Sequence, residues 1–227
     1  RVLTASWDGT ARLWDLIGEA PKWSGEGQCR HHIGGSFSVW MTLSAVHHGD
    51  EVTGYVALIS DMTERRLAEA TIRFQATHDA LTQLANRAAW LAAFNRALAD
   101  AEATGAQVAV LFMDLDGFKK ANDTWGHGVG DVLLATTARR LERCVRRTDL
   151  VGRFGGDEFT ILLSRLTATY APGRVARACV AALKVPFRIE GHDVRIGASI
   201  GVAVFPEHGQ SVDLLVAAAD RAMYEAK

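Results

Sequence analysis

The chain has 227 residues, which is long for one compact domain and typical of one domain with a smaller partner. Its hydrophobic fraction of 48% indicates a folded globular protein, and its formal net charge of -1 argues against a protein that binds nucleic-acid polymers through a basic surface. Since no stretch is apolar for long enough to span a bilayer, we expect no membrane segment.

The N-terminal region carries strand patterns. Residues 36–46 alternate polar and apolar side chains over much of their length, a turn follows, and residues 51–59 return as a second strand. These patterns predict a fragment of antiparallel sheet. The paired histidines at 31–32 and 47–48 are interpreted as exposed turn residues and not as metal ligands, because adjacent residues of a strand point to opposite faces.

A helix is predicted from Thr63, with Asp61 or Thr63 as its cap. Leu67, Ala70 and Phe74 fall on one stripe with heptad-like spacing. The stripe is compatible with a short dimeric coiled coil and equally with an ordinary amphipathic linker.

Helices and strands alternate in the rest of the chain, which predicts an α/β fold: an α+β sandwich with a central, mainly antiparallel sheet flanked by helices. We expect the helix over 129–147 to bury Leu141 and Val145 and to present Arg140 outward. The predicted elements are a helix over 87–103, a strand over 107–112, a helix over 129–147, strands over 150–154 and 159–163, a helix over 171–184, strands over 186–190 and 193–205, and a helix from 212 to the end.

Two acidic residues follow the apolar strand 107–112. Asp114 lies among apolar residues, where an unpaired carboxylate is costly and a magnesium ion would compensate its charge. Asp116 precedes the segment GFKK, so we expect it to cap the next helix.

A second acidic pair lies in the turn of a predicted hairpin. Gly155 and Gly156 permit positive φ and a close approach of a phosphate, and Asp157 and Glu158 repel each other unless a cation lies nearby. Alone, this sequence also fits a solvated acidic turn. If adjacent strands bring Asp114 to this turn, three carboxylates suit two magnesium ions and a triphosphate, which indicates phosphoryl or nucleotidyl transfer.

Six motifs follow one another along the chain: HDALTQLANR at 78–87, DLDGFKKAND at 114–123, GHGVGD at 126–131, RFGGDEF at 153–159, SIGVA at 199–203 and ADRAMYEAK at 219–227. In this order they resemble the GGDEF family of diguanylate cyclases, over roughly residues 64–227. The resemblance implies a nucleotide-cyclase or palm-like fold, Mg²⁺ with Mn²⁺ as the alternative ion, and a bacterial, cytoplasmic signalling enzyme.

The resemblance also implies a role for each matching residue. Asp157 is the expected proton acceptor for the ribose 3′-hydroxyl, with Glu158 supporting the metal ions. The implied metal ligands are Asp114, the Leu115 carbonyl, Asp157 and Glu158, and the implied substrate-binding residues are Phe118, Lys119, Asn122, His127, Asp131, Gly155, Gly156 and Lys227.

The reaction that the resemblance implies joins two GTP molecules into cyclic di-GMP and releases two pyrophosphates. Each domain holds one GTP, so a homodimer is expected for activity. Arg146 and Asp149 match the family's Arg-x-x-Asp inhibitory pattern and are expected to bind the product as a feedback inhibitor. Two other functions remain open: a module that binds GTP or cyclic di-GMP without turnover, and a purely structural dimerisation unit.

The resemblance suggests four segments. Residues 64–77 would be a linker helix and 78–227 the cyclase domain, while 20–63 resemble the C-terminal half of a PAS sensor domain. Residues 1–19 are an uncertain segment whose positions 2–15 are similar to the end of a WD40 blade, and one partial blade cannot close a propeller.

Two departures from the family pattern concern the cyclase segment. Gln83 stands where the family usually has glycine, and we expect little effect on the chemistry. The family's phosphate-contacting arginine has no counterpart up to Lys227, so we expect weaker activity from these residues alone. Finally, the cysteines are odd in number and far apart, which favours small buried side chains in a reducing compartment over disulfides; they are Cys29, Cys144 and Cys179.

Overall fold

The computed structural model of the chain describes residues 22–30, 34–167 and 170–227. The chain divides into two compact units, Arg1–Arg73 and Phe74–Lys227, and each is described here by itself. The WD40-like segment and the first histidine pair lie outside the described residues.

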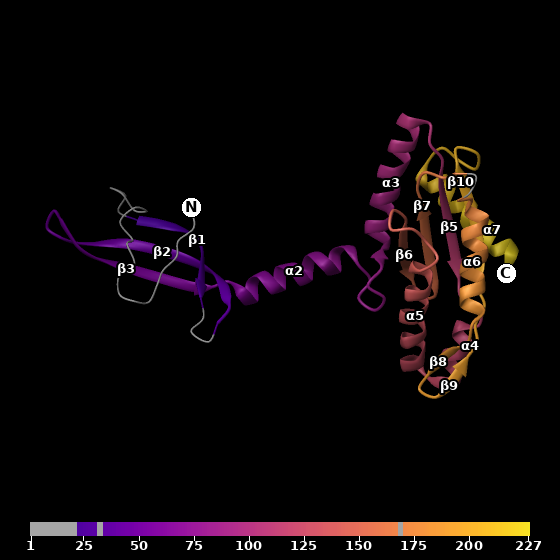
Figure 1. Cartoon of the computed structure of the whole chain (residues 1–227), viewed down its shortest axis with the longest axis horizontal. Helices are drawn as coiled ribbons and strands as arrows, with labels where there is room; N and C mark the ends of the chain where they lie inside the picture. Colours follow the sequence, from indigo (N-terminus) through magenta and orange to yellow (C-terminus); the bar gives the residue numbers. More distant parts are fainter. Residues whose placement is uncertain (1–21, 31–33, 168–169) are drawn as a thin grey trace. The chain divides into compact units, whose positions relative to one another are not determined.

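The N-terminal unit contains a three-stranded antiparallel sheet in the order β1-β2-β3, which Figure 1 shows with β2 at its centre. Its strands are β1 (Lys22–Arg30), β2 (Ser36–His48) and β3 (Glu51–Asp61). Alternate residues of β2 form a small core of Val39, Met41 and Leu43. The predicted antiparallel sheet is therefore confirmed, whereas its resemblance to a PAS domain stays a prediction.

The histidines at 47 and 48 are exposed, as expected, but they are the last residues of β2 and pair with β3, so their placement in the turn is wrong. The helix α2 (Thr63–Thr77) follows β3, and the Thr63 N–H donates a hydrogen bond of 2.8 Å to Asp61 Oδ1 at its start. On the predicted stripe, Leu67 is 63% and Phe74 40% exposed. The stripe thus remains available for a partner, and the coiled coil stays a prediction.

The C-terminal unit is built on a five-stranded sheet in the order β10-β5-β7-β6-β4 (Figure 1). Only the edge pair β4–β6 is parallel, and every other neighbouring pair is antiparallel. The predicted α/β class with a mainly antiparallel sheet is confirmed. The strands are β4 (Ala85–Asn86), β5 (Val108–Asp114), β6 (Leu150–Gly155), β7 (Glu158–Leu163) and β10 (Ser199–Phe205).

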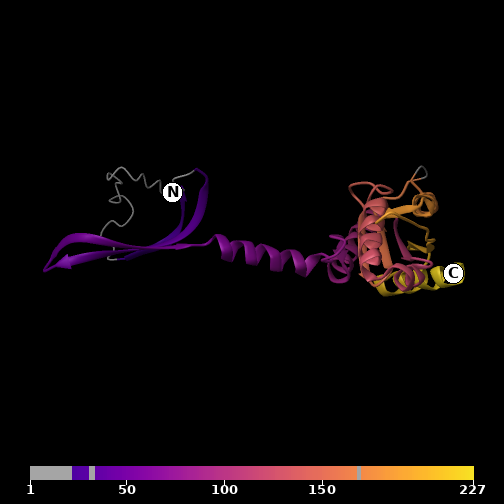
Figure 2. The ribbon, with the colours of Figure 1, turned by 90° about the horizontal axis from the view of Figure 1, so that it is seen from below.

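Helices cover both faces of this sheet, and α7 (yellow) and the orange residues around α6 lie on opposite sides of the strands in Figure 2. One core packs α3 and α7 against Val108, Val110 and Phe112 of β5, and the other packs α5 and α6 against Leu111 and Met113. Central strands buried on both faces explain the nearly continuous apolar run of β5. The helices are α3 (Arg87–Thr104), α4 (Phe118–Trp125), α5 (His127–Glu142), α6 (Pro172–Lys184) and α7 (Val212–Ala226).

Two predicted elements have different bounds. The helix predicted over 129–147 ends at Glu142, because the Asp149 carboxylate accepts a hydrogen bond of 3.0 Å from the Arg146 N–H and holds a turn there. The strand predicted over 193–205 is two strands, β9 (His192–Val194) and β10, and β9 pairs with β8 (Phe187–Ile189) in a separate small hairpin.

Arg140 was expected to point outward, and that expectation is wrong. Its guanidinium donates hydrogen bonds to the carbonyls of Ala182, Val185 and Pro186 and lies 3.6 Å from the Phe187 ring centroid. A planar fork with five donors can satisfy the carbonyls at the end of a helix in this way. Arg140 therefore fastens the end of α6 to α5.

Of the cysteines, Cys179 is buried, Cys29 and Cys144 are partly buried, and all three are free thiols, as predicted.

Candidate active site

The sheet brings the two acidic motifs together. In the antiparallel ladder between β5 and β7, Asp114 is directly opposite Glu158. The Leu115 N–H donates a hydrogen bond of 3.3 Å to the Asp157 carbonyl, so the ladder continues one step into the turn. The predicted juxtaposition of Asp114 with the acidic hairpin is therefore present at one end of the sheet.

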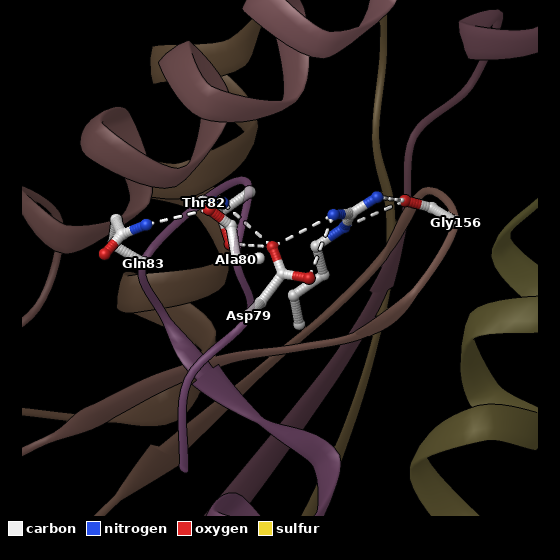
Figure 3. Close-up of polar contacts among 6 residues, drawn as sticks. Asp79, Ala80, Thr82, Gln83 and Gly156 are labelled. Atoms are coloured by element: carbon white, nitrogen blue, oxygen red, sulfur yellow. Dashed lines mark hydrogen bonds and ion pairs between the residues drawn. The ribbon is translucent and has the colours of Figure 1, made fainter. Parts of the chain in front are cut away.

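Hydrogen bonds from Arg153 stabilise the hairpin turn. Gly155 and Gly156 have φ values of 149° and 51°, and only glycine adopts these readily. The Arg153 guanidinium donates to the Gly156 carbonyl at 3.1 and 2.8 Å and to Asp79 Oδ1 at 3.0 Å (Figure 3). Asp79 also accepts hydrogen bonds from the N–H and hydroxyl of Thr82, which fix the orientation of its carboxylate. The turn is thus preorganised before any ligand binds.

Glu158 lies in a strongly negative environment. Its pKa is raised by burial first, then by repulsion from Asp220, Asp114 and Asp157, while Arg87 acts in the opposite direction. A positive ion beside these carboxylates would relieve the repulsion. Asp220 and Arg87 were not among the predicted site residues, although both lie within the motifs that carry the family resemblance.

Lys227 reaches the same carboxylates from α7. Its Nζ lies 2.8 Å from Asp114 Oδ1, and this hydrogen bond is the main reason that the pKa of Lys227 is raised. The Lys227 side chain is 49% exposed, whereas that of Asp114 is 15% exposed. The Lys227 ammonium therefore neutralises part of the acidic cluster, and it is the more exposed partner of the pair.

The donor set fits a magnesium ion that shares its coordination with a substrate. Among the described residues, no three His, Cys, Asp or Glu side chains are arranged so that they alone could hold a metal ion. Asp114, Asp157 and the Leu115 carbonyl supply hard oxygen atoms at one place, and magnesium commonly takes one or two carboxylates and completes its shell with water and substrate phosphates.

We expected Asp116 to cap α4, and that expectation is wrong. Its carboxylate accepts hydrogen bonds of 3.0 and 3.2 Å from the Ser199 hydroxyl, and its backbone pairs with Gly197. The N-cap position of α4 is Gly117, which has no side chain to accept a hydrogen bond. Asp116 therefore ties the loop after β5 to the start of β10, on the side of β5 away from the acidic hairpin.

The predicted guanine-reading residues lie on α4 and α5. Asn122 is partly buried, and its Oδ1 is a buried acceptor without a hydrogen-bond partner. A Cβ at Gly130 would lie 1.8 Å from this oxygen, so a larger residue at this position would force the Asn122 amide to move. Asp131 follows Gly130 and is exposed, as is His127. An unpaired buried amide oxygen on α4 and an exposed carboxylate on the neighbouring α5 are polar groups that a ligand could engage.

The remaining predicted residues are placed less specifically. Phe118 is half-buried against the core of α5 and α6, which is a packing role, and Lys119 is exposed. Arg146 and Asp149 lie in the loop between α5 and β6, where Asp149 Oδ1 also accepts a hydrogen bond of 3.3 Å from the Ser164 N–H. None of these contacts by itself identifies a ligand.

Comparisons with known proteins agree on this unit. The family described as "Diguanylate cyclase, GGDEF domain" matches residues 76–227. The diguanylate cyclase TpbB of Pseudomonas aeruginosa is 40% identical over 179 residues, which are 78% of this chain and 40% of that protein. The chain thus spans less than half the length of this curated relative.

Solved structures show the same similarity. The crystal structure of the GGDEF domain of PA1120 (YfiN or TpbB) from Pseudomonas aeruginosa has 42% identity and a TM-score of 0.62, covering 64% of this chain and 91% of that one. The coiled coil and GGDEF domain of DgcB from Caulobacter crescentus, solved in complex with c-di-GMP, has 30% identity and a TM-score of 0.59, covering 72% and 93%. Within the described residues, none of the helices combines the length and apolar character that a membrane span needs.

Proposed function

The chain belongs to the GGDEF family of diguanylate cyclases, and on this basis we propose that it condenses two GTP molecules into cyclic di-GMP and releases two pyrophosphates. The observation that carries the proposal is the pairing of Asp114 with Glu158 across β5 and β7, beside Asp157. An acidic cluster at the end of a sheet, next to a glycine turn that a phosphate can approach, suits a metal-dependent nucleotidyl transfer.

In this proposal Asp114, Asp157 and the Leu115 carbonyl hold Mg²⁺, or alternatively Mn²⁺, and Glu158 supports them. When bound, the ion would neutralise charge on the triphosphate and polarise the α-phosphate. Lys227 would leave Asp114 and pair with phosphate oxygens, which its exposed side chain permits. The backbone at Gly155 and Gly156, together with Phe118 and Lys119, would line the phosphates.

The base of GTP would be read by Asn122 and Asp131, with His127 beside them. The Asp131 carboxylate can accept hydrogen bonds from the N1–H and amino group of guanine, a donor pattern that adenine does not present. The buried, unpaired Oδ1 of Asn122 is a further acceptor for that edge. These residues would therefore select GTP over ATP.

The chemical step is an in-line displacement. Asp157 accepts the proton of the 3′-hydroxyl of one GTP, and the oxygen attacks the α-phosphorus of the other. A new P–O bond forms, the bond between the α-phosphorus and the bridging oxygen breaks, and pyrophosphate leaves with the electron pair. Repetition in the opposite direction closes the ring. Since each domain would bind one GTP, the proposal requires a homodimer with two facing sites.

Two parts of the chain would regulate the activity: the N-terminal region and the site at Arg146 and Asp149. The sheet-forming region 20–63 would act as a sensor, and residues 64–77 as the linker that sets dimer geometry for the cyclase at 78–227. Arg146 and Asp149 would bind cyclic di-GMP as a feedback inhibitor. A cytoplasmic, reducing location is part of the same proposal, because both the substrate and the product signal belong there.

Incubation with GTP and Mg²⁺, followed by chromatographic separation of nucleotides, tests the proposal. We expect cyclic di-GMP from the unaltered chain and at least a 100-fold lower rate from Asp157→Ala, since a general base contributes about 10²–10⁴-fold. Asp100→Ala, which removes an exposed carboxylate of α3, should retain full activity.

A folded protein that binds GTP and yields no cyclic di-GMP with either ion would contradict the proposal. It would indicate instead the binding module that the sequence left open.

A further inference from the structure

The two residues of the Arg-x-x-Asp pattern are both engaged by one tyrosine. The Arg146 guanidinium carbon lies 3.4 Å from the centroid of the Tyr170 ring. The Tyr170 hydroxyl donates a hydrogen bond to Asp149 Oδ2, the oxygen that also accepts from the Arg146 N–H. Tyr170 therefore occupies the face of the arginine and an oxygen of the aspartate at the same time.

A guanine base could make the same two kinds of contact with this pair. A guanidinium plane stacks on aromatic faces, and a carboxylate accepts hydrogen bonds from N–H or O–H donors. The phenol remains a donor at neutral pH, because burial and the neighbouring Asp149 raise the pKa of Tyr170 to about 12. Chemically, the phenol is a smaller substitute for the base.

The position of Tyr170 permits such an exchange. Its backbone N–H is held by Thr167, at 2.9 Å from the carbonyl and 3.1 Å from the hydroxyl, and α6 begins two residues later. Beside the pair, a cavity of about 330 Å³ is lined by Arg146, Arg147, Asp149 and neighbouring residues. The face of Arg146 and the Asp149 Oδ2 that the phenol contacts become open to a base only when the phenol moves, whereas the rest of a dinucleotide can lie in the cavity beside them.

We propose that Tyr170 occupies the product-binding site in place of a guanine base, and that cyclic di-GMP displaces it on binding. This inference rests on the proposed binding of cyclic di-GMP at Arg146 and Asp149. Because the product binds only the fraction of molecules in which the phenol has left, Tyr170 raises the apparent dissociation constant and the product concentration at which feedback begins.

Calorimetric titration with cyclic di-GMP tests the inference without any need for turnover. We expect Tyr170→Ala to bind about tenfold more tightly than the unaltered chain, since it removes a cation–π contact and a charged hydrogen bond that oppose binding. Tyr170→Phe keeps the ring and removes only the donor, so its affinity should rise by about threefold. Tyr224→Ala, which removes an exposed tyrosine of α7, should leave the affinity unchanged.

Weaker or unchanged binding by Tyr170→Ala and Tyr170→Phe would overturn the inference, because the phenol would then be part of the binding surface or irrelevant to it. Arg146→Ala should remove the gain in the Tyr170→Ala background, and persistence of the gain would place the binding elsewhere. Near-ultraviolet circular dichroism identifies variants that fail to fold, and Tyr170→Phe remains the informative variant if Tyr170→Ala does not.

The proposed enzyme and this inference can fail separately. A chain that makes no cyclic di-GMP, but whose Tyr170→Ala variant binds it more tightly, would keep the inference and remove the proposed activity. A chain that makes the product but binds none at Arg146 in any variant would keep the activity and remove the inference.

Discussion

At the scale of single residues, Gln83 carries a measurable cost. Its φ of 63° lies in the left-handed region, and the corresponding turn of the family usually has glycine. The left-handed conformation costs a non-glycine residue about 1–2 kcal/mol, and the hydrogen bond of 2.8 Å from Gln83 Nε2 to the Ala80 carbonyl returns only part of it. Gln83 is tolerated because its side chain lies on an exposed turn, although its backbone conformation is unfavourable.

We predict that Gln83→Gly raises the free energy of unfolding by about 1 kcal/mol and the melting temperature by about 3 °C. Gln75→Gly is the matched control, because it places glycine inside α2, where it should cost about 1 kcal/mol. Thermal and urea denaturation of both variants measure the two effects. A loss of stability in Gln83→Gly would show that the side chain, and not the backbone, governs this turn.

The sequence predicted single residues best where acidic residues stand at the ends of two clearly apolar strands. Asp114, Asp157 and Glu158 were expected to meet, and the strand register brings them together. Tyr170 was missed because its importance comes from contacts with a loop about twenty positions earlier, which no local pattern contains. Asp116 was misinterpreted for the same reason: its partner, Ser199, is on β10.

At the scale of elements, the turn after α2 is fastened to the acidic hairpin. Asp79 accepts from Thr82 within its own turn and from Arg153 of β6, which in turn holds the Gly156 carbonyl (Figure 3). Burial opposes ionisation of Asp79, but the hydrogen bonds of Thr82 and Arg153 outweigh it and lower the pKa of the carboxyl. The charge of Asp79 therefore stabilises both elements.

We predict that Asp79→Asn lowers the free energy of unfolding by about 2 kcal/mol at pH 7, because a half-buried, charge-assisted hydrogen-bond network is lost. A carboxyl whose folded pKa lies below its unfolded value of 3.8 stabilises fully above that value and loses its contribution as the pH falls through the folded pKa. The difference in free energy of unfolding between the unaltered chain and Asp79→Asn should therefore become smaller below pH 4.

Asp193→Asn is the control for this variant. Its partner Arg188 is 90% exposed, and the pair at 3.5 Å should contribute less than about 0.5 kcal/mol. Urea denaturation between pH 7 and pH 3 measures both variants. Equal losses in the two, or a difference for Asp79→Asn that stays constant in acid, would contradict the role assigned to Asp79.

Elements were predicted well where periodicity was strong and less well at their ends. The apolar run of β5 and the glycine hairpin were located within two residues. The end of α5 and the break between β9 and β10 were not found, because they depend on the Asp149 side chain and on the pairing of Gly197 with Asp116. Both are tertiary contacts that override local propensity.

At the scale of the whole molecule, the fold class could be read from the alternation of elements, and the family from the order of six motifs. The assembly could not, because the proposed reaction of two GTP molecules would need a second copy of the chain, which no pattern in one sequence places. We propose the exposed apolar stripe of α2, with Leu67 and Phe74, as the surface for that contact. The specific activity of the proposed enzyme should accordingly rise with protein concentration.

The most direct measurement of the central claim is therefore the amount of cyclic di-GMP and pyrophosphate formed from GTP and Mg²⁺ over a series of protein concentrations. We predict two pyrophosphates for each cyclic di-GMP, with specific activity rising as the protein dimerises and then reaching a plateau. GTP that remains intact at every concentration, or pyrophosphate released without cyclic di-GMP, would contradict it.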